Sequence, residues 1–391
     1  MDNTPAVLGG EPAFQSRIPM VRPVLPRFSE MEEGIRYILS SGMVTRGKYL
    51  DAFENAVAEH LGVKHALAVS SCTSGLILTY KGLGLTGEVV VPSFTFMATV
   101  SAMIWAGLKP VFAEADPATT NLNPAAAEAA ITPDTSAIVA VHNFGNPADI
   151  RALQDIAAKH GLKLVFDAAH GFGARYEGQP VGSQGDAQVF SMSPTKLLIT
   201  GEGGMVTTDH DDLAEKIRIG REYGNDGKYD SAFPGLNARM PELNALMGLH
   251  SLQNLEQAAL NRNKTAALFQ EELGRLPGIG FQIVRAADRN SYREFSVTVE
   301  AEEFGLTRDQ LALALASENI DSRKYYDPPV HCHTAYQQYY DGKPLPDTEW
   351  LASHSLSLPM WSNMETEVVL GICNAFRRIH EHAAQVGERL A

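Results

Sequence analysis

The sequence has few cysteines and no long hydrophobic run. Its three cysteines, Cys72, Cys332 and Cys373, lie far apart and lack the spacing of a zinc site. We therefore expect neither a disulfide framework nor a bound metal. No apolar run approaches the roughly 20 residues that cross a bilayer, and the first residues lack the basic and apolar segments of a signal peptide. These absences predict a cytoplasmic protein that does not insert into a membrane.

Basic residues are also scarce relative to acidic ones. The chain has 32 lysines and arginines against 46 aspartates and glutamates, which gives a net charge of -14. An acidic chain without long basic clusters is not expected to bind nucleic acid or an anionic membrane surface. Any phosphate group must therefore be held by local geometry and not by the overall potential of the protein.

The first two thirds of the chain have the pattern of an α/β domain. Short β-rich runs alternate with helical patterns from about residue 63 to 208. This alternation predicts a mostly parallel, seven-stranded sheet with helices on both faces. The expected strands are His65–Ser70, Glu88–Val91, Pro110–Glu114, Ala137–Val141, Lys163–Asp167, Ala187–Ser191 and Gly204–Thr208, and the helices between them include Ser74–Gly82, Ala98–Ala106 and Pro147–His160.

The pattern changes after Pro241. One long helix is expected over Leu243–Leu273, followed by strands at Phe281–Val284 and Ser296–Val299 and a helix near Thr307–Glu318. This arrangement is typical of an α+β unit. We therefore predict a large α/β domain over residues 1–255 and a smaller α+β domain over residues 256–391.

Three of the expected parallel strands end in polar residues. The first leads into Ser71–Gly75, which opens a helix; the second ends at Asp167, with His170 three residues later; the third ends at Ser191, five residues before Lys196. Ligands of open parallel sheets bind at the carboxyl ends of the strands. The sequence therefore predicts one site that combines helix-start amides and hydroxyls, a carboxylate, an imidazole and a lysine.

This set of groups meets the requirements of pyridoxal 5'-phosphate (PLP). Its aldehyde needs a lysine amine, which Lys196 offers, and its ring nitrogen needs a carboxylate that keeps it protonated, which Asp167 offers. Its phosphate needs helix-start amides and hydroxyls. The candidates for that last role are Thr73, Ser74 and Ser191.

Each of these residues alone has an ordinary structural explanation. A lysine in a loop is usually a solvated charge, and an aspartate at a strand end is usually a turn former. The run Ser71–Gly75 is typical of a helix N-cap, and Gly201–Gly204 lacks the spacing of a dinucleotide fingerprint. It is the combination in this order that favours a cofactor site.

Longer segments of the chain carry a family resemblance. They are Ser41–Gly47, Val69–Leu76, Val91–Thr99, Phe166–His170, Gly182–Ser191, Pro194–Lys196, Gly235–Met240 and Tyr325–His331. In these segments, which span nearly its whole length, the chain resembles the DegT/DnrJ/StrS family of sugar aminotransferases. The resemblance implies the PLP-dependent transferase fold of type I.

The resemblance also implies a role for each matching residue. Lys196 would be the catalytic lysine that forms the Schiff base with PLP, and Asp167 would be the partner of the pyridine nitrogen. Phe96 would stack on the ring, and His170 would lie near its 3-hydroxyl. Asn237 would reach the phosphate of the cofactor in the partner subunit, which implies a homodimer with shared active sites.

Other positions bear on the substrate and the reaction. Arg239, Tyr325 and His331 lie where the family contacts its sugar. Family members that dehydrate sugars carry histidine in place of the lysine, so Lys196 favours transamination. Cys72 stands where the family usually has glycine, and a positive φ there would strain it; we interpret it as a packing residue and not as a nucleophile.

The implied reaction has two halves. L-Glutamate converts bound PLP into pyridoxamine 5'-phosphate, which then passes the amine to a nucleotide-linked keto sugar. Leu8–Phe14 and Gly235–Met240 most resemble enzymes that act on dTDP-4-keto-6-deoxyhexoses in deoxyaminosugar and antibiotic biosynthesis. A 3-keto sugar or a keto-inositol stays open as the acceptor. A PLP-binding regulatory protein and a plain nucleotide-binding α/β module are the alternatives outside this reaction.

Overall fold

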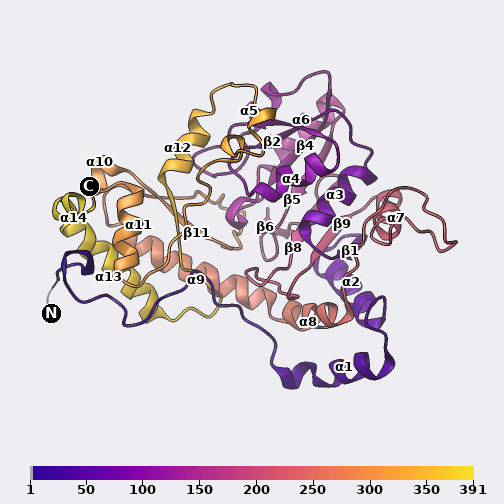
Figure 1. The fold of residues 1–391 in the computed structure, drawn as a ribbon, viewed down its shortest axis with the longest axis horizontal. Helices are drawn as coiled ribbons and strands as arrows, with labels where there is room; N and C mark the ends of the chain where they lie inside the picture. Colours follow the sequence, from indigo (N-terminus) through magenta and orange to yellow (C-terminus); the bar gives the residue numbers. More distant parts are fainter. Residues whose placement is uncertain (1–2) are drawn as a thin grey trace.

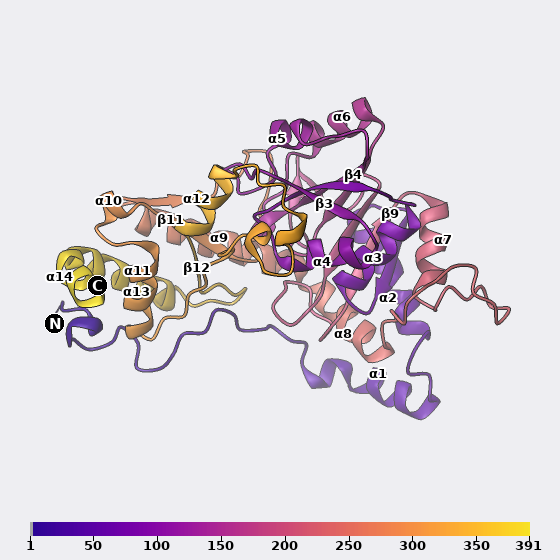
Figure 2. The same cartoon turned by 45° about the horizontal axis from the view of Figure 1, so that its top comes forward.

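The computed structural model describes residues 3–391 and contains a seven-stranded sheet, which lies in the right-hand part of the molecule in Figures 1 and 2. The strand order is β1-β9-β8-β5-β4-β2-β3. All seven expected strands are confirmed, each within one or two residues of its predicted bounds. They are β1 His65–Val69, β2 Glu88–Pro92, β3 Lys109–Ala113, β4 Thr135–Val141, β5 Lys163–Asp167, β8 Ala187–Ser191 and β9 Gly204–Thr208.

The directions of the strands decide which loops meet. Strands β3, β2, β4, β5 and β8 are parallel, while β9 runs antiparallel to both β8 and β1. The carboxyl ends of β1, β5 and β8 therefore lie at the same edge as the start of β9. The predicted mostly parallel sheet is confirmed.

Helices cover both faces of this sheet because its strands are apolar on both sides. One face packs against α2 (Lys48–Leu61), α6 (Ile150–His160) and α8 (Glu242–Gln253). The other packs against α3 (Cys72–Gly82), α4 (Met97–Trp105) and α7 (Asp211–Gly220). A glycine brings α3 close to the sheet, since a Cβ at Gly75 would lie 2.8 Å from Cγ1 of Val189 in β8. This close packing fixes the start of α3 beside the strand ends.

The prediction of one helix over Leu243–Leu273 is wrong. The structure has α8, which ends at Gln253, and α9 (Leu255–Leu273), with Asn254 between them. The Asn254 N–H donates to the carbonyl of Ser251 at 3.2 Å. The Asn254 side chain also donates to the carbonyl of His250, at 3.4 Å. Asparagine competes for backbone hydrogen bonds in this way and so interrupts helices.

The C-terminal part forms a second core around a three-stranded antiparallel sheet. Its strands are β10 Ile279–Phe281, β11 Phe295–Val299 and β12 Ser355–Leu358, in that order, and its helices include α9, α11 Arg308–Ser317, α13 Thr366–Glu381 and α14 Ala383–Leu390. Residues of the N-terminal segment, among them Leu8 and Ile18, pack on this second core. Both chain ends accordingly lie at the same end of the molecule in Figure 1. The domain boundary near residue 255 stays a prediction.

Shorter elements complete the chain. They are η1 Ala6–Leu8, α1 Phe28–Ser41, α5 Pro124–Ala129, η2 Asn143–Gly145, β6 Arg175–Tyr176, β7 Gln179–Pro180, α10 Ala301–Phe304, η3 Val330–Cys332, η4 Gln337–Tyr339 and α12 Pro346–His354. Within residues 3–391, no helix combines the length and the apolar character that crossing a bilayer requires.

Candidate active site

A cavity of about 370 Å³ opens where β1, β5 and β8 end. The start of α3, the loop between β8 and β9, and segments from the C-terminal part of the chain form its walls. Seven residues predicted from the sequence line this one cavity: Thr73, Phe96, Asp167, His170, Ser191, Lys196 and Tyr325. The structure therefore brings together the lysine, the carboxylate, the imidazole and two of the hydroxyls.

Lys196 lies in the loop that connects β8 to β9. The backbone N–H of Lys196 donates to the carbonyl of Ser193 at 3.0 Å, and this bond holds the loop in a tight turn. Part of the residue stays accessible through the cavity, but protein surrounds the amine. Burial, and then the positive charge of Arg293, lower the pKa of Lys196 to about 7. A large fraction of the amine is therefore neutral near pH 7, the state in which it can attack a carbonyl carbon.

Asp167 ends β5 and is buried, with 4% of its surface exposed. Its Oδ2 accepts from Oγ1 of Thr99 at 2.7 Å, and its Oδ1 accepts from the N–H of Ala169 at 3.0 Å. Burial raises the pKa of the Asp167 carboxyl, while these two hydrogen bonds and the charge of Lys196 oppose that shift. Within residues 3–391, no basic side chain forms an ion pair with Asp167. A protonated ring nitrogen would supply the missing positive partner.

His170 lies on the turn that follows β5. Burial lowers the pKa of its imidazole well below the ordinary value, so the ring is neutral at physiological pH. Its Nδ1 is buried and has no hydrogen-bond partner within the described part of the chain. Buried polar atoms are nearly always paired. A ligand hydroxyl in the cavity would satisfy this atom, and the 3-hydroxyl of PLP is such a group.

The start of α3 offers one wall for a phosphate. Oγ of Ser71 accepts from the N–H of Ser74 at 3.1 Å, while Oγ of Ser74 accepts from the N–H of Ser71 at 3.1 Å. This reciprocal pair is a capping box, and it directs the Ser74 hydroxyl to the helix end and not to the cavity. Thr73 and Ser191 line the cavity, and Ser71 joins them. The helix dipole of α3 adds a positive end there.

Cys72 is the first residue of α3. It is not among the residues with positive φ, so the strain expected from a glycine position does not arise. Its thiol is buried 3.8 Å from Oδ1 of Asp167. Burial, together with the negative charge of Asp167, raises the pKa of this thiol well above its ordinary value. A thiol held neutral in this way packs and does not act as a nucleophile.

Besides Ser74, three predicted residues do not line this cavity. His331 is buried, and its Nδ1 lies 2.6 Å from Oγ of Ser93. Asn237 is exposed, and its backbone forms a bridge with that of Glu222. Arg239 pairs with Glu222, with 3.0 Å between Nη1 and Oε2. The structure therefore separates Asn237 and Arg239 from Lys196 within one chain.

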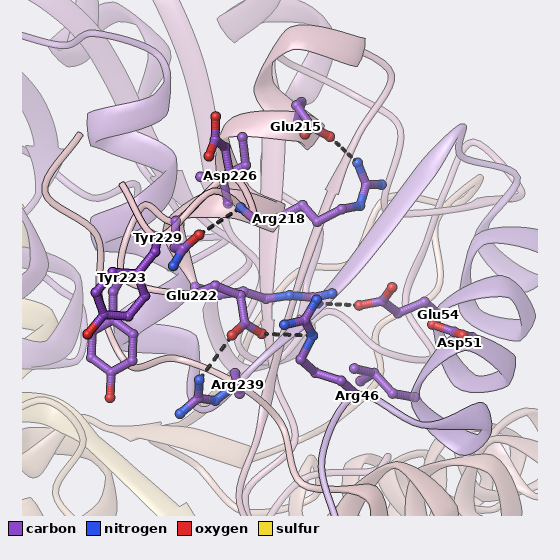
Figure 3. Close-up of a pocket in the computed structure, with 15 residues that line it drawn as sticks. Arg46, Asp51, Glu54, Glu215, Arg218, Glu222, Tyr223, Asp226, Tyr229 and Arg239 are labelled. Atoms are coloured by element: carbon purple, nitrogen blue, oxygen red, sulfur yellow. Dashed lines mark hydrogen bonds and ion pairs between the residues drawn. The ribbon is translucent and has the colours of Figure 1, made fainter. Parts of the chain in front are cut away.

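Arg239 instead lines a second and larger cavity of about 750 Å³ (Figure 3). In Figure 3, Glu222 lies between Arg239 and Arg46; its Oε1 is 3.7 Å from Nε of Arg46. Arg221 contacts Glu54 in the same region. Size alone does not indicate the reaction site, because the residues among 3–391 that line this cavity include neither a lysine nor any residue from the ends of β5 and β8.

Four residues that contact Asp167 or line the cavity were not predicted as site residues from the sequence. They are Thr99, which donates to Asp167, and Arg293, Glu294 and Tyr326, which line the cavity. Arg293 and Glu294 directly precede β11, about 100 residues after Lys196. A charged pair ahead of an apolar strand was the only signal, and nothing in the sequence pattern places that pair at the cavity.

Comparison with known proteins shows similarity over nearly the whole chain. The family model for the DegT/DnrJ/EryC1/StrS aminotransferase family matches residues 28–377. The spore coat polysaccharide biosynthesis protein SpsC of Bacillus subtilis (strain 168) is 36% identical over 358 residues, which cover 87% of this chain and 92% of SpsC.

Solved structures are similar as well. DesI, crystallised in the presence of its TDP-sugar product, is 37% identical with a TM-score of 0.90, and the match covers 98% of this chain and 97% of DesI. DesV of S. venezuelae, in complex with a ketimine intermediate, is 34% identical with a TM-score of 0.87, and the match covers 94% of this chain and 99% of DesV.

Proposed function

The chain belongs to the DegT/DnrJ/EryC1/StrS aminotransferase family, and from this premise we propose that it transfers an amino group from L-glutamate to a nucleotide-linked keto sugar. It is a PLP-dependent aminotransferase with the type I fold of such enzymes, and members of its family are sugar aminotransferases. The observation that carries the proposal is the position of Lys196, Asp167 and His170 around one cavity.

The side chains around the cavity fit PLP. When bound, PLP supplies an electron sink for the carbon that loses its proton. Asp167 would hold the ring nitrogen protonated, and the unpaired Nδ1 of His170 would meet the ring hydroxyl. Phe96, at the start of α4, would stack on the ring, and 50% of its surface is exposed. Thr73 and Ser191, together with the capped start of α3, would hold the phosphate.

Lys196 would carry the proton transfers. With the pKa of its amine lowered to about 7, Nζ can both accept and donate a proton near neutral pH. The donor amino acid would lose a proton from its α-carbon to Nζ, and Nζ would return a proton to the carbon of the cofactor. The second half of the reaction reverses these steps on the keto sugar.

We further propose dTDP-4-keto-6-deoxyglucose as the acceptor, with its 4-amino sugar as the product. The similarity to DesI, which was crystallised with its TDP-sugar product, supports a dTDP-linked sugar. A 3-keto sugar or a keto-inositol is the alternative acceptor. L-Glutamate should change the absorption of the bound cofactor and release 2-oxoglutarate. The amine form should then react with the 4-keto sugar at least about tenfold faster than with either alternative. No 2-oxoglutarate from the wild-type protein would reject the proposed function.

The proposed enzyme is a homodimer in which each site borrows Asn237 from the partner. The exposure of Asn237 and its absence from the Lys196 cavity of its own chain support this arrangement. Asn237→Asp would place a carboxylate against the cofactor phosphate of the other subunit. The repulsion should weaken cofactor binding at least about tenfold, measured by absorbance titration of the apoprotein.

A mixed dimer of Asn237→Asp and Lys196→Ala chains tests whether Asn237 serves the partner subunit or its own. One of its two sites would combine Lys196 from the first chain with Asn237 from the second. Mixing should therefore restore up to about half of the wild-type activity per heterodimer, although each parent stays poor. If mass spectrometry shows subunit exchange and activity is still absent, Asn237 does not serve the partner subunit.

A further inference from the structure

Two buried arginines and one buried glutamate lie close together, and one of the arginines and the glutamate line the cavity. Arg262, Arg293 and Glu294 are 2%, 6% and 4% exposed, and Nη1 of Arg293 contacts Oε1 of Glu294. Within residues 3–391, Arg262 has no acidic partner at ion-pair distance. Burial, and then the charge of Arg293, lower the pKa of Arg262 to about 9. The cluster therefore carries one positive charge more than its carboxylate neutralises.

The protein itself uses the donors of Arg262. Its Nη1 donates to the backbone carbonyls of Tyr292 at 2.9 Å and of Arg293 at 3.2 Å, and its Nε donates to Oγ of Ser362 at 3.1 Å. These bonds hold the segment that leads into β11 in a fixed position. Arg262 supports that segment, whereas the neighbouring Arg293 lines the cavity.

Arg293 has an unused donor. Its Nε is buried and has no partner within the described part of the chain, although Nη1 is held by Glu294. Among residues 3–391, Arg293 and Lys196 are the only arginine and lysine that line this cavity. Of the charged side chains around Lys196, Arg293 has the largest effect on the pKa of the lysine amine. An anionic group between the two would satisfy both the free donor and the surplus charge.

We propose that Arg293 binds the α-carboxylate of the amino-acid donor. This inference rests on the proposed function, which has an amino acid deliver its amine at Lys196. The carboxylate is attached to the carbon that bears that amine, so it must lie within a few ångströms of the reacting nitrogen. Arginine presents paired N–H donors that match a carboxylate, and Glu294 leaves the Nε edge of the guanidinium open. Arg293 is thus a specificity residue for the donor.

The test is the reaction of L-glutamate with the PLP-loaded enzyme. Arg293→Gln should lower kcat/KM for L-glutamate about 10- to 150-fold, because a charge-assisted contact is lost. L-Isoglutamine, in which an amide replaces the α-carboxylate, should react poorly with the wild type. Arg293→Gln should slow that poor donor less than threefold, because the partner group is already missing. Arg293→Lys keeps the positive charge but lacks the paired N–H donors of arginine, so it should recover part of the rate.

Two further measurements make the result specific. 2-Methyl-L-glutamate has no α-hydrogen and binds without turnover, and its Kd, read from cofactor absorbance, should rise by a similar factor in Arg293→Gln. At the pH optimum of each variant, which corrects for the effect of Arg293 on the pKa of Lys196, the reaction of the amine form with the keto sugar should change less than threefold. Arg151→Gln removes an exposed arginine that pairs with Glu177 away from the cavity, and it should match the wild type in every assay.

The possible failures are distinguishable. If the wild type releases no 2-oxoglutarate from L-glutamate, the proposed function fails. If the wild type is active but Arg293→Gln slows L-glutamate and L-isoglutamine equally, Arg293 does not bind the α-carboxylate. If Arg293→Gln slows only the reaction with the keto sugar, Arg293 binds the acceptor and not the donor. If Arg293→Gln does not fold by circular dichroism, Arg293→Lys carries the same comparison: an equal loss with both donors rejects the proposal.

Discussion

Replacement of Lys196 by alanine should lower the rate of transamination at least about 1,000-fold while the protein keeps its fold and oligomeric state. The amine of Lys196 serves both as the group that holds the cofactor aldehyde and as the acid–base for the proton transfers, so both contributions are lost together. The fold should survive because Lys196 lies in a loop and contributes a reactive amine, not apolar packing, to the cavity. Rates of 2-oxoglutarate release and the circular dichroism spectrum measure the two effects.

Lys159→Ala provides the matched control. Lys159 lies on α6, where its exposed amine pairs with Glu128 and does not reach the cavity. This variant should show wild-type rates. Near-normal turnover by Lys196→Ala would show that another residue performs the chemistry.

Replacement of Asp167 by asparagine should slow the reaction about 100- to 1,000-fold, equivalent to roughly 3–4 kcal/mol in the barrier. Asparagine keeps the size of the side chain and can still accept the bond from Thr99, but it carries no negative charge. The ring nitrogen would then lose its proton and withdraw less electron density from the reacting carbon. Some cofactor should stay bound, because the phosphate and ring contacts are untouched.

The measurement is kcat/KM for L-glutamate together with the amount of bound cofactor. Asp155→Asn, on the exposed side of α6, removes one carboxylate far from the cavity and should leave both values unchanged. A loss below about tenfold, or roughly 1.4 kcal/mol, in Asp167→Asn would mean that Asp167 only ends its strand.

The edge of the large sheet could be predicted from the sequence because local patterns determine it. The apolar strands alternate with helices, their parallel order follows from right-handed crossovers, and Asp167 and Ser191 follow directly from the strand ends. Lys196 reaches the same edge because β9 starts there and runs antiparallel to its neighbours. The family resemblance then implied a role for each of these residues.

Contacts between distant segments could not be predicted in this way. Thr99 reaches Asp167 from the first turn of α4, and Arg293 enters the cavity from the segment before β11; periodicity carries no signal for either approach. The break at Asn254 depends on a side chain that competes for backbone bonds within an otherwise helical pattern. The position of Ser74 in a capping box also depends on side-chain geometry, since Thr73, its neighbour, faces the cavity.

Borohydride reduction of the PLP-loaded protein, followed by peptide mass spectrometry, tests the central claim most directly. Reduction makes the link between a lysine amine and the cofactor permanent, so the modified peptide identifies the lysine. We predict the added mass of the reduced cofactor on the peptide that contains Lys196, with none on that peptide in Lys196→Ala. The cofactor mass on a different lysine of the fully active wild type, with Lys196 unmodified, would contradict the account.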